Sequence, residues 1–347
     1  MHTQTIYKRP QTMIVKMKSK VRFSSWVLLL LPVISLFWLS LKAEKSTTRA
    51  KRACGSQVES YVMRPNAWTG FRPRAMPRKI IWGMLFDCEE WLLEIKLNEV
   101  GHLVDHFILV EGLYSLQNRR RQQCFPRIAS ANPRISKWLP KIVYIYDTQY
   151  IQGFQYWEAE VYYRNLIGLQ GLRQLSLRDD DLMVVSDVDE LLSAPFLHFL
   201  KWNEGFPTLI KVRLLWSYYA FYWVNPNLFQ KGMVASIKEL SDLGQNRTNA
   251  IRFNLLGGAQ VWSPVAIAGW HCSWCIPTEA FLSKMQNFAH SQLNTRDHSS
   301  LSFLSTMRQH GLWFPDQQPN ACIQSRPQFP SYVQANVYRF HQLTVIM

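Results

Sequence analysis

Leu182-Met-Val-Val-Ser-Asp187-Val-Asp189-Glu190 is the stretch that decides the fold class of this 347-residue chain. Its apolar run predicts a buried strand of a parallel sheet, because such strands are covered on both faces. Two aspartates spaced i, i+2 follow at the carboxyl end of the strand, which is the edge where open α/β sheets bind ligands. These carboxylates would repel each other unless a cation joined them, and hard oxygen ligands suit Mg²⁺ or Mn²⁺. The stretch therefore predicts a metal site that holds a substrate diphosphate, against the alternative of a polar turn after a strand.

The segments on either side predict that this strand belongs to one large α/β domain. Apolar runs predict further strands, and apolar residues at helical spacing predict helices between them. This β-α-β order implies a mostly parallel central sheet with right-handed crossovers. The expected strands are 80–86, 106–110, 141–146, 182–186, 208–215 and 233–237, and the expected helices are 89–100 and 155–177.

The N-terminal part of the chain predicts a membrane anchor. Residues 23–41 carry no charge and would span roughly 28 Å as a helix, enough for the hydrocarbon core of a bilayer. The flanks are basic, and Leu41-Lys-Ala-Glu-Lys45 stands where a signal peptide would have small residues for cleavage. We therefore expect a cytosolic tail at 1–22, a transmembrane signal anchor at 23–41, a stem at 42–78 and a lumenal domain at 79–347.

The net charge of +15 does not indicate a nucleic-acid-binding protein. Residues 1–52 hold eleven basic residues and one acidic residue, so most of the excess belongs to the anchor and its flanks. The remaining excess of about five charges is spread over nearly three hundred residues, which is ordinary for a soluble domain. We expect a membrane contact through the anchor and no nucleic-acid partner.

The cysteines and one sequon fit a lumenal domain. The chain has six cysteines, an even number that permits disulfides in an oxidising compartment. Cys272 and Cys275 have the spacing of a zinc-binding pair, but no second pair at ligand spacing accompanies them, so a disulfide role is favoured. Asn246-Arg-Thr248 is the N-glycosylation sequon. The disulfide candidates are Cys88, Cys124, Cys272, Cys275 and Cys322, and their pairing stays open.

Four segments in this order are typical of a known family. They are 78–111, Asp180-Asp-Leu-Met-Val-Val-Ser-Asp-Val-Asp-Glu190, Ala268-Gly-Trp-His-Cys-Ser-Trp-Cys275 and Tyr338-Arg-Phe-His341. The Trp-His-Cys string is long and rich in rare residues, so a chance match is improbable. Through these segments the chain resembles glycosyltransferase family seventeen, the bisecting β-1,4-mannosyl-glycoprotein 4-β-N-acetylglucosaminyltransferases.

The resemblance implies a GT-A-like nucleotide-sugar-binding fold with a UDP-N-acetylglucosamine donor and Mn²⁺, with Mg²⁺ as the other suitable ion. The acceptor would be the O4 hydroxyl of the β-linked core mannose in the N-glycan of a glycoprotein, and the transfer would invert the anomeric centre. The same resemblance implies a single-pass type II protein of the Golgi membrane, in agreement with the predicted anchor.

The first site residues are those expected to hold the donor. Asp187 and Asp189 would position the metal on the diphosphate, where it neutralises charge on the leaving group. His271 could complete the metal or diphosphate shell, or be a hydrogen-bonded core histidine. Glu111 ends a strand near the expected uridine and could bind ribose or uracil, or be a solvated strand end. Arg164 could reach phosphate, or form an ion pair.

Inversion also needs a general base that takes the proton from the attacking hydroxyl. Glu279 is the candidate, because Pro277-Thr-Glu-Ala-Phe-Leu282 looks like the start of a helix facing the acceptor. The alternative is a first-turn glutamate that only complements the helix dipole. Asp297 and Asp316 are further candidates for the base, and His341 is a further candidate for the metal shell.

Two other function classes remain open at the level of sequence. Aspartyl-phosphate phosphatases also carry an Asp-x-Asp after a strand, but they favour Thr or Val where this chain has Leu191, and their nucleophile lies nearer the start of the domain. A glycan-binding relative without turnover is the other class, because the 112–118 loop departs from the family pattern.

Overall fold

The structure is a computed structural model in which all described residues belong to one unit, Ser46–Met347. Among the described residues, no helix has both the length and the apolar character that a membrane span needs. The predicted tail, the anchor, most of the stem, Asn246, Asp297 and Asp316 lie outside this part. The described residues are 70–150, 157–242, 248–253, 260–261, 267–296, 298–315, 322–323 and 328–345.

The described elements alternate between strands and helices along the first half of the domain. The strands are β1 (Arg72–Pro73), β2 (Ile80–Leu85), β3 (His106–Gly112), β4 (Ile142–Asp147), β5 (Leu182–Ser186), β6 (Glu190–Leu192), β7 (Asn203–Glu204), β8 (Leu209–Tyr218), β9 (Trp223–Val224), β10 (Phe229–Ser236), β11 (Gln260–Val261), β12 (Gly269–Ser273) and β13 (Cys322–Ile323). The α-helices are α3 (Glu90–Val100), α4 (Phe125–Ala131), α5 (Pro133–Ser136), α6 (Glu158–Leu166), α7 (Ala194–Trp202), α8 (Ile237–Asp242), α9 (Thr248–Phe253), α10 (Phe281–Asn287), α11 (Leu301–His310), α12 (Ser331–Ala335) and α13 (His341–Thr344).

The central sheet is mixed, which corrects the prediction of a mostly parallel one. Its strands run in the order β13-β9-β8-β10-β5-β2-β3-β4. The four strands from β5 to β4 are parallel, as predicted, but β10 is antiparallel to both β5 and β8. Only residues 219–228 connect β8 to β10, and a connection this short favours antiparallel pairing over a parallel crossover. Strand β12 then returns parallel to β8.

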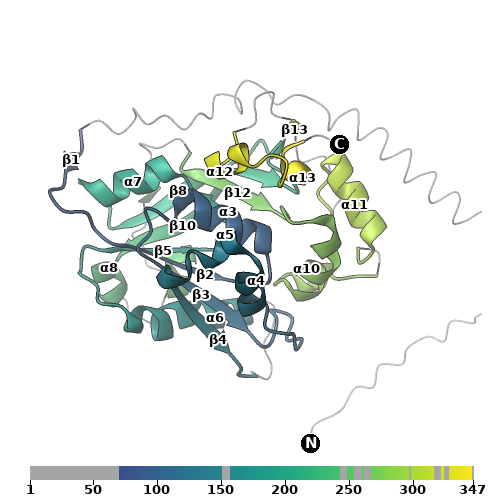
Figure 1. The fold of residues 1–347 in the computed structure, drawn as a ribbon, viewed down its shortest axis with the longest axis horizontal. Coiled ribbons are helices and arrows are strands. Elements are labelled where there is room, and N and C mark those ends of the chain that lie inside the picture. The colour runs from purple at the N-terminus through teal and green to yellow at the C-terminus, as the bar shows by residue number, and fades with distance from the viewer. Residues whose placement is uncertain are drawn as a thin grey trace, which may run out of the picture. The chain divides into compact units, whose positions relative to one another are not determined.

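Helices α3 and α6 cover opposite faces of the parallel strands (Figure 1). Side chains of β2 alternate between the two faces, as the period of a strand requires. Trp82 and Met84 pack in one core cluster with α3 side chains such as Leu97, while Ile81 packs in the other with Leu166 of α6. The apolar runs that predicted these strands are therefore buried on both sides, which is typical of a parallel sheet.

The predicted helix 155–177 is interrupted. Helix α6 ends at Leu166 and continues as a π turn, Ile167–Gly171, and a 3-10 turn, Leu172–Gln174. Glycine has low helix propensity, and Gly171 is needed because a Cβ there would overlap the Ile108 side chain of β3. The break lets the segment lie close against the sheet.

The order of the parallel strands creates a topological switch point. The chain passes from β2 to β3 and β4 on one side and then returns to place β5 on the other side of β2. Loops leaving the carboxyl ends of β2 and β5 therefore diverge and leave a crevice, which is where open α/β sheets bind ligands. Asp87 follows β2 and Asp187 follows β5, so both lie at this crevice.

Candidate active site

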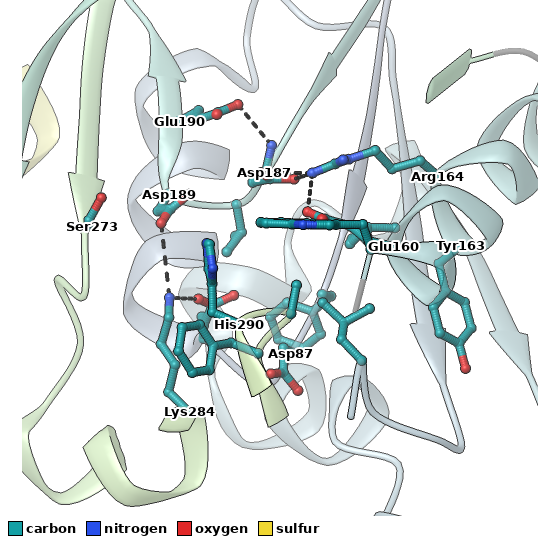
Figure 2. Close-up of a pocket in the computed structure, with 18 of the residues that line it drawn as sticks. Asp87, Glu160, Tyr163, Arg164, Asp187, Asp189, Glu190, Ser273, Lys284 and His290 are labelled. Atoms are coloured by element: carbon teal, nitrogen blue, oxygen red, sulfur yellow. Dashed lines mark hydrogen bonds and ion pairs between the residues drawn. The ribbon is translucent and has the colours of Figure 1, made fainter. Parts of the chain in front are cut away.

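A pocket of 1090 Å³ occupies the switch point (Figure 2). One part of its lining comes from the ends of β2 and β3 and from α6, and another part comes from β8, β12 and α10. Four of the predicted site residues line this pocket, namely Asp187, Asp189, His271 and Arg164. Residues that are far apart in the sequence thus share one cavity of the size that small-ligand sites have.

Asp187 is held by two arginines. Arg164 Nη2 donates to its two carboxylate oxygens at 2.7 and 3.0 Å, and Arg252 Nη2 donates to Oδ2 at 3.1 Å. Arg252 also donates to both oxygens of Glu190 at 2.6 Å, and Arg164 pairs with Glu160. Burial opposes the charged form of Asp187, but the two guanidinium groups outweigh it and hold the pKa of Asp187 below its usual range. Asp187 is therefore part of an ion-pair network in the pocket wall.

A buried lysine, Lys96, fixes the turn after β5. Lys96 Nζ donates to Ser186 Oγ at 2.9 Å and to the carbonyl oxygen of Asp187 at 2.7 Å. Trp82 Nε1 donates to the same hydroxyl at 2.7 Å, and the Asp187 amide donates to Glu190 Oε2 at 3.0 Å. Burial lowers the pKa of Lys96 to about 7, against the pull of the nearby carboxylates. These bonds fix the backbone that presents Asp189 to the pocket.

Asp189 has different neighbours from Asp187. Its Oδ2 lies 3.6 Å from Nε2 of His271 and 3.9 Å from Nζ of Lys284. Burial again opposes ionisation, but His271 and Lys284 outweigh it and lower the pKa of Asp189. Both distances exceed that of a normal hydrogen bond, so the lone pairs of Asp189 remain available to an incoming cation.

The donor set around Asp189 fits a divalent metal. His271 lies on β12, which pairs with β6 so that His271 stands opposite Glu190. Its Nε2 faces both Asp189 and the Ser273 hydroxyl, which lies 3.1 Å away. A carboxylate oxygen suits Mn²⁺ or Mg²⁺, and the added imidazole nitrogen favours Mn²⁺. Of the two aspartates, Asp189 is thus the one whose surroundings suit a metal ligand.

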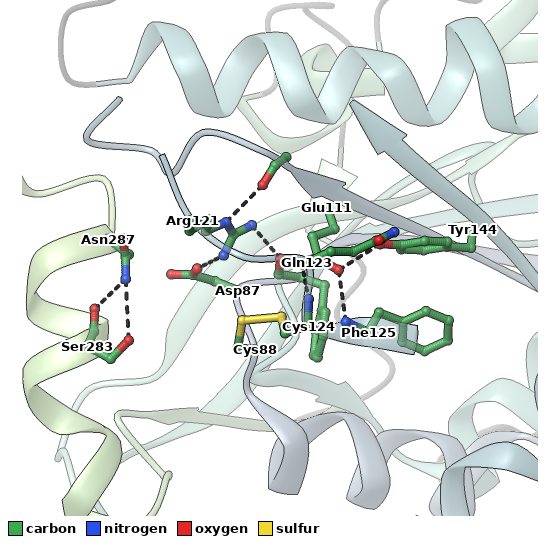
Figure 3. Close-up of a disulfide and its surroundings, with 12 residues drawn as sticks. Asp87, Cys88, Glu111, Arg121, Gln123, Cys124, Phe125, Tyr144, Ser283 and Asn287 are labelled. Carbon is green, nitrogen blue, oxygen red and sulfur yellow. Dashed lines mark hydrogen bonds and ion pairs between the residues drawn. A yellow bond between two sulfur atoms is a disulfide. The ribbon is translucent and has the colours of Figure 1, made fainter. Parts of the chain in front are cut away.

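Glu111 lies outside this pocket. Its side chain is buried and accepts hydrogen bonds from the amides of Cys124 at 2.6 Å and Phe125 at 3.0 Å, and from the Tyr144 hydroxyl at 2.8 Å (Figure 3). It thereby supplies acceptors to the start of α4. The adjacent Cys88–Cys124 disulfide joins this helix to the end of β2. Cys88, Glu111 and Cys124 lie close together, but disulfide sulfurs offer no thiolate to a metal.

The remaining predicted cysteines are also disulfide-bonded. Cys272 near the end of β12 pairs with Cys275 just after it, and Cys322 is bonded as well. The first of these bonds leaves no thiolate for zinc, in agreement with the predicted disulfide role. It also constrains the loop between His271 and α10, which both line the pocket.

Two other candidates do not reach the pocket. Glu279 is exposed in a 3-10 turn, Thr278–Ala280, just before α10. His341 is exposed at the start of α13, with its Nδ1 3.2 Å from the Tyr338 carbonyl oxygen. Helix α10 begins later than the sequence suggested, and it presents Lys284 to the pocket instead of Glu279.

Glu89, Arg252 and Lys284 are among the charged residues of the pocket that the sequence analysis missed. Glu89 had a detectable pattern, because it follows the first strand at the same sheet edge as Asp187. The two basic residues had none, since only the tertiary fold brings α9 and α10 to the turn after β5. Burial raises the pKa of Glu89 to about 7, while its ion pair with Lys284 opposes this shift.

Comparison with known proteins identifies relatives of this chain. Residues 59–303 match the model of glycosyltransferase family 17. Three curated proteins named beta-1,4-mannosyl-glycoprotein 4-beta-N-acetylglucosaminyltransferase are similar to the chain over 84% of its length. The one from Homo sapiens is 25% identical, the one from Rattus norvegicus 25% and the one from Mus musculus 24%. The chain spans 60% of the length of the human relative and 59% of the other two.

Two solved structures show a weaker likeness. A 4-diphosphocytidyl-2C-methyl-D-erythritol synthase has a TM-score of 0.34 and 10% identity, over 61% of this chain and 99% of that one. A glucosyl-3-phosphoglycerate synthase from Mycobacterium tuberculosis, in complex with Mn²⁺, UDP and phosphoglyceric acid, has a TM-score of 0.26 and 12% identity, over 71% and 81%. At these scores neither likeness carries an argument.

Proposed function

The chain belongs to glycosyltransferase family 17, and from this premise we propose that it transfers N-acetylglucosamine from UDP-N-acetylglucosamine to an N-glycan. The acceptor that we propose is the O4 hydroxyl of the β-linked core mannose, with inversion at the anomeric carbon. The names of the three curated relatives support this choice. The observation that carries the proposal is the meeting of Asp189 and His271 in a large pocket at the topological switch point.

Asp189 and His271 would hold Mn²⁺, with Mg²⁺ as the weaker fit. When bound, the ion would neutralise the negative charge that develops on the UDP leaving group. The pocket lining contains six acidic and five basic side chains, so its own cations do not suffice for a diphosphate. The basic residues in it are Arg121, Arg164, Lys231, Arg252 and Lys284.

Aromatic side chains of the same pocket suit the acceptor sugar. The lining includes Trp216 of β8, Trp274 after β12 and Trp313 after α11. The apolar face of a pyranose stacks on such rings, while its hydroxyls need polar partners. Trp216 is stacked on His271 with an interplanar angle of 9°, so its orientation is fixed next to the proposed metal ligand.

We also propose a type II arrangement in the Golgi membrane, with residues 79–347 in the lumen. The charge-free segment 23–41 and its basic flanks support this location. Disulfides in the described domain support an oxidising compartment. A protease-protection assay on sealed Golgi vesicles would test it, because a lumenal domain resists added protease until detergent is present.

The transfer itself is tested on the full-length chain purified in detergent. The protein is incubated with UDP-N-acetylglucosamine, MnCl₂ and a biantennary N-glycan, and the glycan is analysed by mass spectrometry with linkage determination. We expect the addition of one N-acetylhexosamine to O4 of the core mannose. Addition to another position would refute the acceptor. Glycan binding with no addition would favour a non-catalytic relative, and phosphomonoester hydrolysis alone would favour the phosphatase class.

A further inference from the structure

Glu89 is a largely buried acid in the pocket, with a side chain 10% exposed, to which the preceding account gives no role. It is the residue immediately before α3, and it lines the pocket together with Asp189. Its only described ion pair is with Lys284, whose Nζ contacts Oε1 of Glu89 and lies 3.9 Å from Asp189 Oδ2. Figure 2 shows Lys284 reaching from α10 towards Asp189. The lysine thus connects Glu89 with the proposed donor site.

Glu89 differs from the other acids of the pocket in its partner. Four of those acids are paired with arginines, whose guanidinium groups stay charged at every pH and favour the ionised carboxylate, although burial still raises the pKa of Glu160. In the Glu190 pair, one arginine occupies both carboxylate oxygens. In the Glu89 pair, the lysine contacts Oε1 only, so Oε2 keeps its lone pairs for another donor. The four arginine-paired acids are Asp87, Glu160, Asp187 and Glu190.

We propose that Glu89 is the general base of the reaction, and that Lys284 is the residue that positions it. This inference rests on the proposed transfer and deepens it. The carboxylate of Glu89 takes the proton from the attacking acceptor hydroxyl. The hydroxyl oxygen forms the new bond to the anomeric carbon of the donor. The bond from that carbon to the β-phosphate oxygen breaks, its electron pair leaves with UDP, and neutral Glu89 then returns its proton to solvent.

The surroundings of Glu89 suit this role. Burial raises its pKa to about 7, Lys284 opposes that shift, and the negative charges of Asp189 and Asp87 add to it. A base works best when its pKa lies near the working pH, because it is then ionised and still has useful proton affinity. The neighbouring Cys88–Cys124 disulfide fixes the turn that carries Glu89. The carboxylate is therefore oriented before substrate binds.

The inference is tested with Glu89→Gln and with Glu90→Gln as a matched control. Glu90 is the next residue, lies outside the pocket lining and accepts a hydrogen bond from Asn132 that glutamine can also accept. Transfer from UDP-N-acetylglucosamine to the N-glycan and binding of UDP with Mn²⁺ are both measured. We expect E89Q to lower kcat by about 100-fold or more and E90Q to leave it within about threefold. UDP affinity should stay within about threefold in E89Q, because a base acts on the acceptor and contributes little to donor binding.

A pH profile separates a base from a structural residue. In the wild type, kcat should fall as the pH drops below about 7, because Glu89 then becomes protonated. The residual kcat of E89Q should not show this fall at acidic pH. Lys284→Met should move the fall (the acid limb of the profile) to higher pH, because it removes the positive charge that lowers the pKa of Glu89.

Three results would overturn the inference. The first is a kcat of E89Q close to that of the wild type, and the second is an unchanged acid limb in E89Q. The third is a collapse of kcat in Glu279→Gln with E89Q active, which would return the role to the acid predicted from sequence. A wild-type protein that binds UDP but transfers no sugar would overturn the proposed function together with this inference.

Discussion

At the residue scale, the two aspartates of the Asp-x-Asp motif have different surroundings. Asp187 interacts with Arg164 and Arg252, whereas Asp189 faces His271 and a pocket that can take a cation. From sequence alone, both aspartates are predicted to hold the same metal ion. The structure separates them, because the chain turns at Val188 and Asp189 between β5 and β6, so Asp187 meets α6 and α9 whereas Asp189 meets β12 and α10.

The first prediction follows from this difference. Asp189→Asn should abolish Mn²⁺-dependent UDP binding and leave the free energy of unfolding within about 1 kcal/mol of the wild type. Asp187→Asn should destabilise the fold by about 1–3 kcal/mol, because two buried arginines lose a charged partner. Isothermal titration and chemical denaturation measure the two effects. Equal loss of UDP binding with equal loss of stability in both variants would contradict the assignment.

A second prediction concerns Lys96 and pH. Its pKa is about 7 in the folded protein, whereas an unperturbed lysine has a pKa of 10.5, so between these values the unfolded chain binds more protons. The free energy of unfolding should therefore rise with pH from about 7 to about 10, by up to about 1.4 kcal/mol per pH unit. Below pH 7 Lys96 is protonated in both the folded and the unfolded state, so it does not make the free energy of unfolding depend on pH.

Denaturation curves at several pH values measure this rise. Lys96→Met should remove it, because methionine does not titrate. Lys137→Met changes an exposed lysine and should keep it. A slope that persists in the Lys96 variant would assign the pH dependence to other groups.

At the element scale, the pairing of β6 with β12 sets the geometry of the site. Gly269 pairs with Leu192, and His271 pairs with Glu190, so the register places His271 beside the Asp189 turn. The close approach of the two strands depends on Gly269. A Cβ at this position would overlap the carbonyl oxygen of Leu191.

Gly269→Ala should therefore force β6 and β12 apart. We expect a loss of about 1–3 kcal/mol in the free energy of unfolding, as for other overpacked sites. Metal affinity should fall as well, because Asp189 and His271 no longer converge. Thermal unfolding and titration with Mn²⁺ measure the two effects. A variant with unchanged stability and unchanged Mn²⁺ affinity would show that the pairing does not position the site.

At the scale of the whole described domain, the C-terminal segment 328–345 stabilises α3 and, through it, the pocket. Glu94 of α3 is fully buried, and its carboxylate accepts hydrogen bonds from Arg339 Nε at 2.7 Å and from Arg339 Nη2 at 2.6 Å. The Tyr332 hydroxyl donates to the same carboxylate at 2.9 Å. Helix α3 begins directly after Glu89 and carries Lys96, so this segment supports two residues of the site from a distance.

Arg339→Met should lower the free energy of unfolding by about 2 kcal/mol, because buried Glu94 loses its bidentate cation. The control is Arg72→Met, which breaks an ion pair on the surface with Glu204 and should leave the free energy of unfolding nearly unchanged. Urea denaturation of the two variants gives the comparison. An equal effect in both would mean that the segment does not support α3.

The sequence predicted the parallel half of the sheet well, because apolar runs buried on both faces report directly on such strands. It could not predict that β10 and β8 are antiparallel, since partner choice depends on connection length and tertiary packing. Asp187 and Asp189 could be predicted because they follow a strand, His271 because it lies in the Trp-His-Cys string, and Arg164 because its helix precedes the motif strand. Lys284 and Arg252 could not, because the fold alone brings their helices to the site. Glu279 lies outside the pocket because α10 begins at Phe281, later than the sequence pattern around Glu279 suggested.

The central claim is that Asp189 binds the metal on which sugar transfer depends. The most direct measurement is UDP release from UDP-N-acetylglucosamine with a biantennary N-glycan, with Mn²⁺ and after its removal by EDTA, for the wild type and Asp189→Asn. The account predicts turnover that EDTA abolishes, that added Mn²⁺ restores in the wild type, and that Asp189→Asn lacks under all conditions. Turnover that persists in EDTA or in Asp189→Asn would contradict it.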